Sequence, residues 1–245
     1  MFRIILRGDD LQRPANLLLT HHTILATGRG VKLLICVAAH EGDFTATILF
    51  LFALRLMRYC HAMRAMREDL AEILLSEEQI QHRLDELASE IQRDYAAKDL
   101  TLVPVLTGSV MFVADLLRRL TMQLRVDYIG VSSYHGETRS TGELIVTKAL
   151  RLDVRGRDVL VIDDILDTGL TLAKIRDMIG KLQPRSLRFG VLLEKDVPHE
   201  VEFKADYVGF RIPNKFVVGY GLDYRERYRN LPYVGTLKAQ VYAKQ

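Results

Sequence analysis

An apolar run that ends in two adjacent carboxylates constrains the fold of this chain most. Residues 159–162 are Val-Leu-Val-Ile, Asp163 and Asp164 follow them, and Asp167-Thr168-Gly169 forms the next polar turn. Such a short, fully apolar run is typical of a buried strand in a parallel sheet. With a helix expected at residues 171–182, the segment predicts a strand, a turn and a helix.

Strands and helices alternate along the chain from residue 76 onward. The capping-box signature of residues 76–79, Ser-Glu-Glu-Gln, predicts a helix start, and apolar residues then recur at helical spacing, at Ile80, Leu84, Leu87 and Ile91. We predict another helix at residues 110–120, a polar loop at 135–142, and strands at 102–106, 126–134, 143–148, 188–193, 207–212 and 216–220. This alternation favours an α/β fold with a doubly wound, mostly parallel sheet and flanking helices, which binds ligands beyond the carboxyl ends of its strands.

Residues 1–65 differ in composition from the rest of the chain. They hold both cysteines and four of the seven histidines, but only four acidic residues. We therefore expect an N-terminal extension at 1–65 and a separate domain at 66–245, with the extension dispensable for its folding. One interpretation is that translation starts at Met63 or Met66. The alternative is a real extension, either a targeting peptide or a membrane-surface helix near residues 45–58.

The composition excludes several classes of protein. Lys and Arg number 34 against 31 Asp and Glu, and this net charge of +3 gives no support for nucleic-acid binding. Two cysteines, Cys36 and Cys60, form neither a disulfide framework nor a zinc pattern, so a reducing cytoplasm fits best. The most apolar run, residues 44–54, is too short to cross a membrane.

The turn after the two carboxylates is suited to binding a phosphate. Residues 168–171 place backbone N–H groups at a helix N-terminus, which attracts anions such as a phosphate monoester. Asp163 and Asp164 would bind ribose hydroxyls or hold Mg²⁺ through waters, since hard cations prefer oxygen, and Asp167 would face a base. Asp-rich turns are also common as plain helix caps. Two carboxylates after an apolar strand favour a ligand site, because unpaired buried charge is unfavourable.

Residues 159–171 resemble the signature of type I phosphoribosyltransferases, which binds phosphoribosyl pyrophosphate (PRPP). More narrowly, residues 66–238 are similar to the bacterial hypoxanthine-guanine phosphoribosyltransferase family. The resemblance implies a small hood, a mobile lid, and Asp167 as general base at the purine N7. It implies a PRPP site made of Asp163, Asp164, Asp167, Thr168, Gly169, Leu170 and Thr171.

Other segments support this resemblance. Residues 106–109 resemble the family's pyrophosphate loop, with a non-proline cis peptide and contacts from Thr107 and Gly108; Thr107 stands where some members carry Lys. Ser133 and Tyr134 begin the segment similar to the lid. Lys195 matches the lysine that reads the purine 6-oxo group, and Arg229 matches an arginine that reaches pyrophosphate. Residues 215–224 match the purine and second-metal segment, which implies roles for Lys215, Phe216, Val217 and Asp223.

The implied reaction transfers the 5-phosphoribosyl group of PRPP to hypoxanthine or guanine, giving IMP or GMP and pyrophosphate. The resemblance implies Mg²⁺ held by Asp163, Asp164 and Asp223, Phe216 stacked on the base, and a homodimer or homotetramer. A xanthine-preferring phosphoribosyltransferase stays open as an alternative. So does a non-catalytic regulator of this fold that binds nucleotide or RNA, although Asp167, Lys195 and Asp223 together favour an enzyme. A PRPP-synthesising enzyme would need an ATP site, and the sequence has no P-loop pattern.

Overall fold

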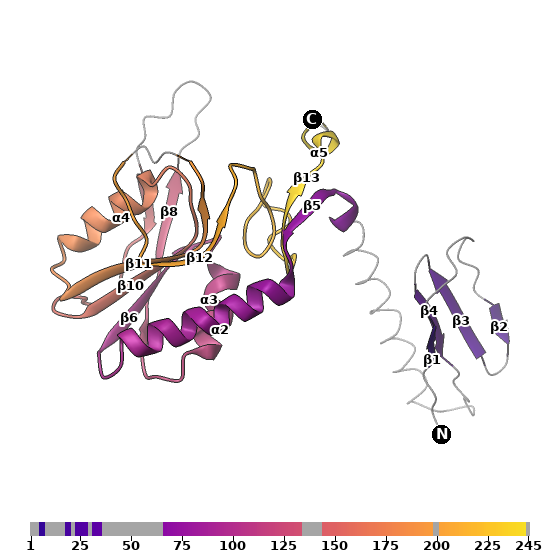
Figure 1. Ribbon diagram of the computed structural model, residues 1–245, viewed down its shortest axis with the longest axis horizontal. Coiled ribbons are helices and arrows are strands. Elements are labelled where there is room, and N and C mark those ends of the chain that lie inside the picture. The colour runs from indigo at the N-terminus through magenta and orange to yellow at the C-terminus, as the bar shows by residue number, and fades with distance from the viewer. Residues whose placement is uncertain are drawn as a thin grey trace. The chain divides into compact units, whose positions relative to one another are not determined.

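The chain divides into two compact units, residues 1–64 and 65–245. The computed structural model describes residues 66–133, 144–197 and 201–243, together with four strands of the first unit (Figure 1). Those strands form an antiparallel sheet in the order β1-β4-β3-β2. They are β1 (Ile5–Arg7), β2 (Leu18–Thr20), β3 (Thr23–Gly28) and β4 (Val31–Ile35).

The second unit is built on a seven-stranded sheet. Its order is β12-β11-β10-β6-β8-β9, with β7 also paired to β6. All these pairs are parallel except β8 with β9, so the predicted mostly parallel sheet is confirmed. The strands are β6 (Leu100–Leu106), β7 (Arg125–Val126), β8 (Ile129–Ser133), β9 (Leu144–Lys148), β10 (Asp158–Leu166), β11 (Ser186–Lys195) and β12 (Tyr207–Ile212).

Helices cover both faces of this sheet. Helices α2 (Glu77–Asp94) and α3 (Val110–Arg119) lie on one side and α4 (Leu170–Gly180) on the other (Figure 1). Alternate residues of β10 feed the two cores: Leu160 and Ile162 pack with α2 and α3, whereas Val159 and Val161 pack with α4. A strand buried on both faces must be apolar throughout, which explains the run that the sequence shows at 159–162.

Helix α2 begins where the sequence predicts. Ser76 is its N-cap: the Ser76 hydroxyl accepts a hydrogen bond from the Gln79 N–H, and the Gln79 side chain accepts one from the Ser76 N–H. Both bonds satisfy N–H groups that a helix start leaves without partners. The apolar stripe is buried as expected, at Ile80, Leu84, Leu87 and Ile91.

A small hood forms beside the sheet from segments far apart in sequence. Strand β5 (Leu70–Leu75) pairs antiparallel with β13 (Val234–Leu237), and the short helix α5 (Ala239–Ala243) follows. The predicted strand at 216–220 is wrong, because this stretch forms only isolated bridges. Gly219, Tyr220 and Gly221 have φ angles of 99°, 51° and 105°. Left-handed backbone cannot continue an extended strand.

Two other strand predictions need correction. Strand β10 runs to Leu166, so Asp163 and Asp164 lie within it and not at its end. The strand expected at 126–134 is interrupted at Asp127, whose carboxylate accepts hydrogen bonds from the N–H groups of Tyr128 and Leu152 and so turns the chain there. The loop predicted at 135–142 lies outside the described residues.

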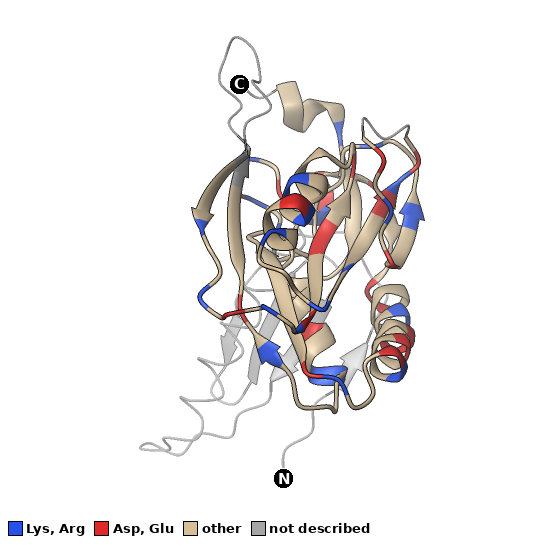
Figure 2. Cartoon of the chain, turned by 90° about the vertical axis from the view of Figure 1, so that its left-hand side faces the viewer, with Lys and Arg blue, Asp and Glu red and all other residues tan. Residues whose placement is uncertain are grey.

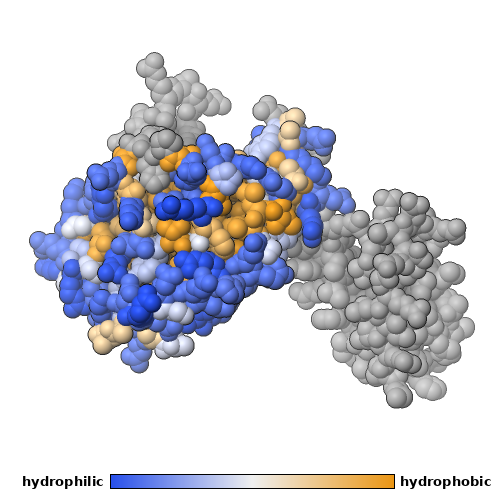
Figure 3. Space-filling model, viewed as in Figure 1, coloured by the Kyte–Doolittle hydropathy of each residue, from blue (hydrophilic) through white to orange (hydrophobic). Residues whose placement is uncertain are grey.

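The surface of the described residues is mixed in charge and mostly hydrophilic. Lys and Arg lie interspersed with Asp and Glu and do not gather into one stripe (Figure 2). One face shows an apolar area bordered by hydrophilic residues (Figure 3). Among the described residues, none of the helices has the length and apolar character needed to cross a membrane.

Candidate active site

A cavity opens at the carboxyl edge of the sheet, where two neighbours of β10 differ in length. Strand β6 pairs with β10 only as far as Ile162, whereas β11 pairs with it to Leu166. Beyond Ile162, β10 is not paired with β6, and a cavity of about 250 Å³ lies there beside Asp163 and Asp164. It is lined by the ends of β6 and β10, Gly108, and the turn that leads into α4.

The two adjacent carboxylates are poorly solvated. Asp163 is buried, and burial raises its pKa well above the usual range, with the negative charge of Asp164 adding to the effect. Burial also raises the pKa of Asp164. A Cβ added at Gly108 would lie 1.7 Å from Asp164 Oδ2, so the chain approaches this carboxylate closely. Oxygen-only groups of this kind suit ribose hydroxyls or a hard cation.

The turn before α4 presents free backbone N–H groups. Gly169 is the N-cap in a left-handed conformation, with φ 84°, and no side chain caps the helix. The plain capping role considered for this turn is therefore absent. The first N–H groups of α4 lack intrahelical partners and carry the positive end of the helix dipole. They form an anion site at the cavity, which Thr168 and Thr171 also line.

A close ion pair joins the ends of two neighbouring strands. Lys195 is the last residue of β11, and its Nζ lies 2.5 Å from Oδ2 of Asp167, just after β10. The Lys195 side chain is 12% exposed and that of Asp167 45%. Because β10 and β11 run parallel, their carboxyl ends meet, and a cationic donor lies beside a carboxylate at the cavity.

The purine segment, residues 215–224, approaches the same edge. Phe216 is 51% exposed, so one side of its ring is open for contact, whereas Val217 is buried. The Phe216 ring packs edge-to-face against Tyr224 and against Tyr242 of α5, each 6.0 Å away between ring centroids. Lys215 pairs with Glu72 of the hood strand β5.

The pyrophosphate loop, residues 106–109, meets the segment that carries Arg229. The Leu106–Thr107 peptide is cis, as the resemblance implies. A Cβ added at Gly221 would lie 2.0 Å from the Gly108 carbonyl oxygen, so these backbones touch. Arg229 donates to the Gly221 carbonyl at 2.8 Å and pairs with Asp223 at 2.9 Å.

With this geometry established, comparison with known proteins decides the family. The protein-family model described as "Phosphoribosyl transferase domain" matches residues 71–225. Hypoxanthine-guanine phosphoribosyltransferase of Staphylococcus epidermidis is 50% identical over 179 residues, 73% of this chain and 100% of that protein. The chain belongs to the hypoxanthine-guanine phosphoribosyltransferase family.

Solved structures of this family share the fold. A crystal structure of a hypoxanthine phosphoribosyltransferase from Staphylococcus aureus matches with TM-score 0.70 and 48% identity, covering 73% of this chain and 97% of that one. The hypoxanthine phosphoribosyltransferase of Trypanosoma cruzi matches with TM-score 0.68 and 41% identity, covering 72% and 95%. The type I phosphoribosyltransferase fold expected from the sequence is therefore confirmed.

The carboxylates predicted as metal ligands do not form one metal cage. Among the described residues, no group of three His, Cys, Asp or Glu side chains could hold an ion by itself. Asp163 and Asp164 lie in β10, whereas Asp223 is engaged by Arg229 and by the Glu226 N–H. In this phosphoribosyltransferase, Mg²⁺ at either place would therefore need further oxygens from substrate or water, as Mg²⁺ commonly does.

The lid of the predicted site lies mostly outside the described residues, and the sequence interpretation assigned no role to two tyrosines near the site. Ser133 ends β8, while Tyr134 lies outside the described residues, so the contacts expected from the lid are not described. Tyr242 was missed, because a single tyrosine near the end of the chain carries no motif; its contact with Phe216 depends on the pairing of β13 with β5. Tyr220 is expected from the sequence as part of a strand and of the 215–224 segment; the structure buries it in the core that α2 and α3 share with the sheet.

Proposed function

We propose that this chain transfers the 5-phosphoribosyl group of PRPP to hypoxanthine or guanine, releasing IMP or GMP and pyrophosphate. The observation that carries the proposal is the contact between Lys195 and Asp167 beside the anion site of α4. A 6-oxopurine offers an acceptor at its 6-oxo group and a nitrogen, N7, on the same edge. A lysine donor and a carboxylate acceptor side by side match that edge.

The phosphate ends of PRPP would bind on two sides of the anomeric carbon. The 5-phosphate would accept hydrogen bonds from the N–H groups of residues 168–171, and Asp163 and Asp164 would hold the ribose hydroxyls. Thr107, Gly108 and Arg229 would contact the pyrophosphate. Holding both ends fixes the anomeric carbon in line with the attacking purine nitrogen.

Mg²⁺ would be held at two places, by Asp163 and Asp164 and by Asp223, with PRPP oxygens or water completing each set of ligands. When bound, it would neutralise charge on the leaving pyrophosphate. Asp167 would take the proton from N7 as the purine attacks, in a transition state with oxocarbenium character. Phe216 would stack on the base, and the segment from Ser133 and Tyr134 onward would exclude water.

Lys195 would set the choice of base. Its ammonium only donates hydrogen bonds, so it matches a 6-oxo acceptor and faces the 6-amino donor of adenine unfavourably. A site built on such a hydrogen bond discriminates strongly against a base that cannot form it. Adenine should therefore be a poor substrate.

A panel of purine bases tests this proposal. Hypoxanthine, guanine, xanthine and adenine are each supplied with PRPP and Mg²⁺, and nucleotide and pyrophosphate are quantified. We expect turnover with hypoxanthine and guanine and at least about 10²-fold lower kcat/KM with adenine. Turnover mainly with xanthine would change the substrate assignment. Binding of PRPP or nucleotide without turnover of any base would indicate a regulator.

We further propose that the chain acts in the cytoplasm as a homodimer or homotetramer. Apolar side chains are exposed on β7 to β9 and beside them, at Val126, Tyr128, Ile145 and Val146. Such residues support burial between subunits. Sedimentation equilibrium should give a mass of two or four chains; a monomer at micromolar concentration would contradict the proposal.

A further inference from the structure

The purine segment reverses direction against the pyrophosphate loop. Residues 219–221 have left-handed backbone, and the Gly221 N–H donates to the Arg229 carbonyl at 2.9 Å. At this turn Gly221 touches the carbonyl of Gly108, and Gly108 in turn touches Asp164. The backbones of Gly221 and Gly108 and the carboxylate of Asp164 therefore meet without room for a methyl group. A small shift of the purine segment would therefore displace both Gly108 and Asp164.

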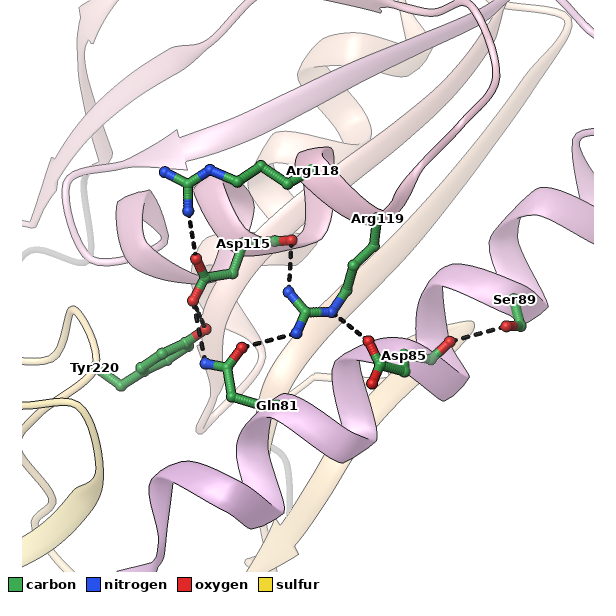
Figure 4. A network of polar contacts seen from close by, with 7 residues as sticks. All are labelled: Gln81, Asp85, Ser89, Asp115, Arg118, Arg119 and Tyr220. Carbon is green, nitrogen blue, oxygen red and sulfur yellow. Dashed lines mark hydrogen bonds and ion pairs between the residues drawn. The ribbon is translucent and has the colours of Figure 1, made fainter.

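One side chain from this turn points into the protein. Tyr220 is 4% exposed, and its hydroxyl donates to Oδ2 of Asp115 at 2.6 Å (Figure 4). Asp115 belongs to α3, the helix that begins at Val110, directly after the pyrophosphate loop. The single hydrogen bond therefore joins the purine segment to the helix that carries the pyrophosphate loop.

The Asp115 carboxylate, which accepts the bond from Tyr220, is also oriented by other side chains. Arg118 donates to Oδ1 of Asp115 at 2.8 Å, and Gln81 of α2 donates to Oδ2 at 3.3 Å. Arg119 then ties the Gln81 carbonyl at 2.8 Å to the Asp85 carboxylate at 2.6 Å (Figure 4). Two helices thus support one carboxylate, and charge-assisted hydrogen bonds of this kind are the stronger ones.

The Tyr220 hydroxyl stays a donor at any physiological pH. Burial raises its pKa far above 10, and the hydrogen bond to Asp115 raises it further. None of the groups in this network has a place in the mechanism proposed above, since no member touches the purine, the ribose or a phosphate. The network therefore lies behind the site and supports it from outside.

We propose that Tyr220 and Asp115 are positioning residues that set the distance between the pyrophosphate loop and the purine segment, and so hold the site open to the width of PRPP. This rests on the proposed function. Losing the bond frees the turn to shift against Gly108, which weakens contacts of the pyrophosphate group. Lys195 lies on β11, outside this connection, and the Phe216 ring is also held by Tyr242 of α5, so recognition of the purine changes less than that of the pyrophosphate.

The test uses Tyr220→Phe in the full chain, with Tyr207→Phe as its matched control. The Tyr207 hydroxyl also donates to a carboxylate, Asp94, at 2.8 Å, but at the opposite edge of the sheet. We expect Tyr220→Phe to raise KM for PRPP, and for pyrophosphate in the reverse reaction, about tenfold, as expected for a hydrogen bond to a charged group. KM for guanine should change less than about threefold. Tyr207→Phe should lower only the melting temperature.

Variants of Asp115 keep the proposal testable if Tyr220→Phe folds poorly. Asp115→Asn retains an acceptor for the tyrosine hydroxyl and should keep KM for PRPP within about twofold of wild type, whereas Asp115→Ala should match Tyr220→Phe. The double variant Tyr220→Phe/Asp115→Ala should be no worse than either single change, because both remove the same bond.

Two outcomes overturn the inference. One is a lowered melting temperature with KM for PRPP unchanged in both Tyr220→Phe and Asp115→Ala. The other is an equal rise of KM for PRPP in Tyr207→Phe. Binding of Mg²⁺–PRPP measured by calorimetry gives the same comparison without turnover. If wild type binds PRPP but turns over no purine, the proposed function fails while the positioning role is still measured by the binding constants.

Discussion

The ammonium of Lys195 lies 2.5 Å from a carboxylate oxygen of Asp167. These residues end neighbouring parallel strands, and each would otherwise be an unpaired charge beside the cavity. A 6-oxopurine that enters between them must exchange this ion pair for its own hydrogen bonds. In the proposed site, the ion pair orients the donor and the acceptor in the free protein, and the hydrogen bonds to the base would offset its loss on binding.

Lys195→Ala should reduce the preference for guanine over adenine. The change removes the donor to the 6-oxo group and leaves Asp167 unpaired, so kcat/KM for guanine should fall about 10²-fold or more. Lys98→Ala is a suitable control, because Lys98 donates to the Asp94 carbonyl and does not line the cavity. The measurement is kcat/KM for guanine and adenine at saturating PRPP. If both the guanine value and the ratio stay unchanged, Lys195 does not read the base.

Asp223→Ala should weaken the Mg²⁺-dependent binding of PRPP or pyrophosphate. Asp223 pairs with Arg229, so its loss removes the proposed oxygen ligand and one of the contacts that hold that arginine. We expect the Mg²⁺ concentration for half-maximal PRPP binding to rise about tenfold. Glu226→Ala is the control, since Glu226 contacts the same arginine but its side chain is 82% exposed. Identical magnesium titrations for wild type and Asp223→Ala would exclude the second-metal role.

Much of the fold could be predicted because its signals are local. The capping box at Ser76, the buried stripe of α2 and the apolar run of β10 each depend on neighbouring residues, and each is confirmed. The hood was expected from the resemblance alone, because β5 and β13 pair across most of the second unit and local patterning does not reveal that pairing. The strand expected at 216–220 failed because period-two patterning does not reveal left-handed backbone at Gly219 to Gly221.

In the site, too, features that depend on neighbouring residues could be predicted, whereas contacts between distant residues could not be derived from local patterns. The anion site follows from the turn at Gly169, because a helix start presents free N–H groups wherever it occurs. The contact of Lys195 with Asp167 depends on strand order, and that of Tyr220 with Asp115 joins residues 105 positions apart. Motif matching names the first pair, but only packing reveals the second.

Asp163→Asn should stabilise the free protein at neutral and higher pH. The pKa of Asp163 is raised by burial above its ordinary value of 3.8, so the folded state binds the proton more tightly than the unfolded state. The resulting destabilisation is absent below about pH 3.8, grows as pH rises toward the raised pKa, and is complete above it. Asp163→Asn has no carboxyl group to ionise at this position, so it lacks this destabilisation.

Thermal melts without Mg²⁺ or PRPP measure this effect. The variant should melt about 2 °C or more above wild type at pH 8, with the difference vanishing toward pH 4. It should also bind PRPP more weakly, because a ribose or metal ligand is lost. A variant less stable than wild type at pH 8 would show that the Asp163 charge is satisfied in the free protein.

We propose that residues 66–245 suffice for activity. Asp69 accepts hydrogen bonds from the Lys238 N–H and the Tyr228 hydroxyl, each at 2.9 Å, and β5 follows it. A chain that starts at Met66 keeps these contacts, so its kcat/KM should stay within about twofold of the full chain. A chain that starts at Ser76 lacks β5 and should melt at lower temperature with reduced PRPP binding. Unfolding of the 66–245 chain would instead make residues 1–65 structural.

We propose that Asp167 and its surroundings transfer a phosphoribosyl group to a 6-oxopurine. The most direct test is the hypoxanthine-dependent release of pyrophosphate from PRPP with Mg²⁺, in wild type and in Asp167→Asn. We predict one IMP for each pyrophosphate in wild type, and a kcat about 10²–10⁴-fold lower in the variant with PRPP binding retained. No hypoxanthine-dependent pyrophosphate release by wild type, or a near-wild-type kcat in Asp167→Asn, would contradict this account.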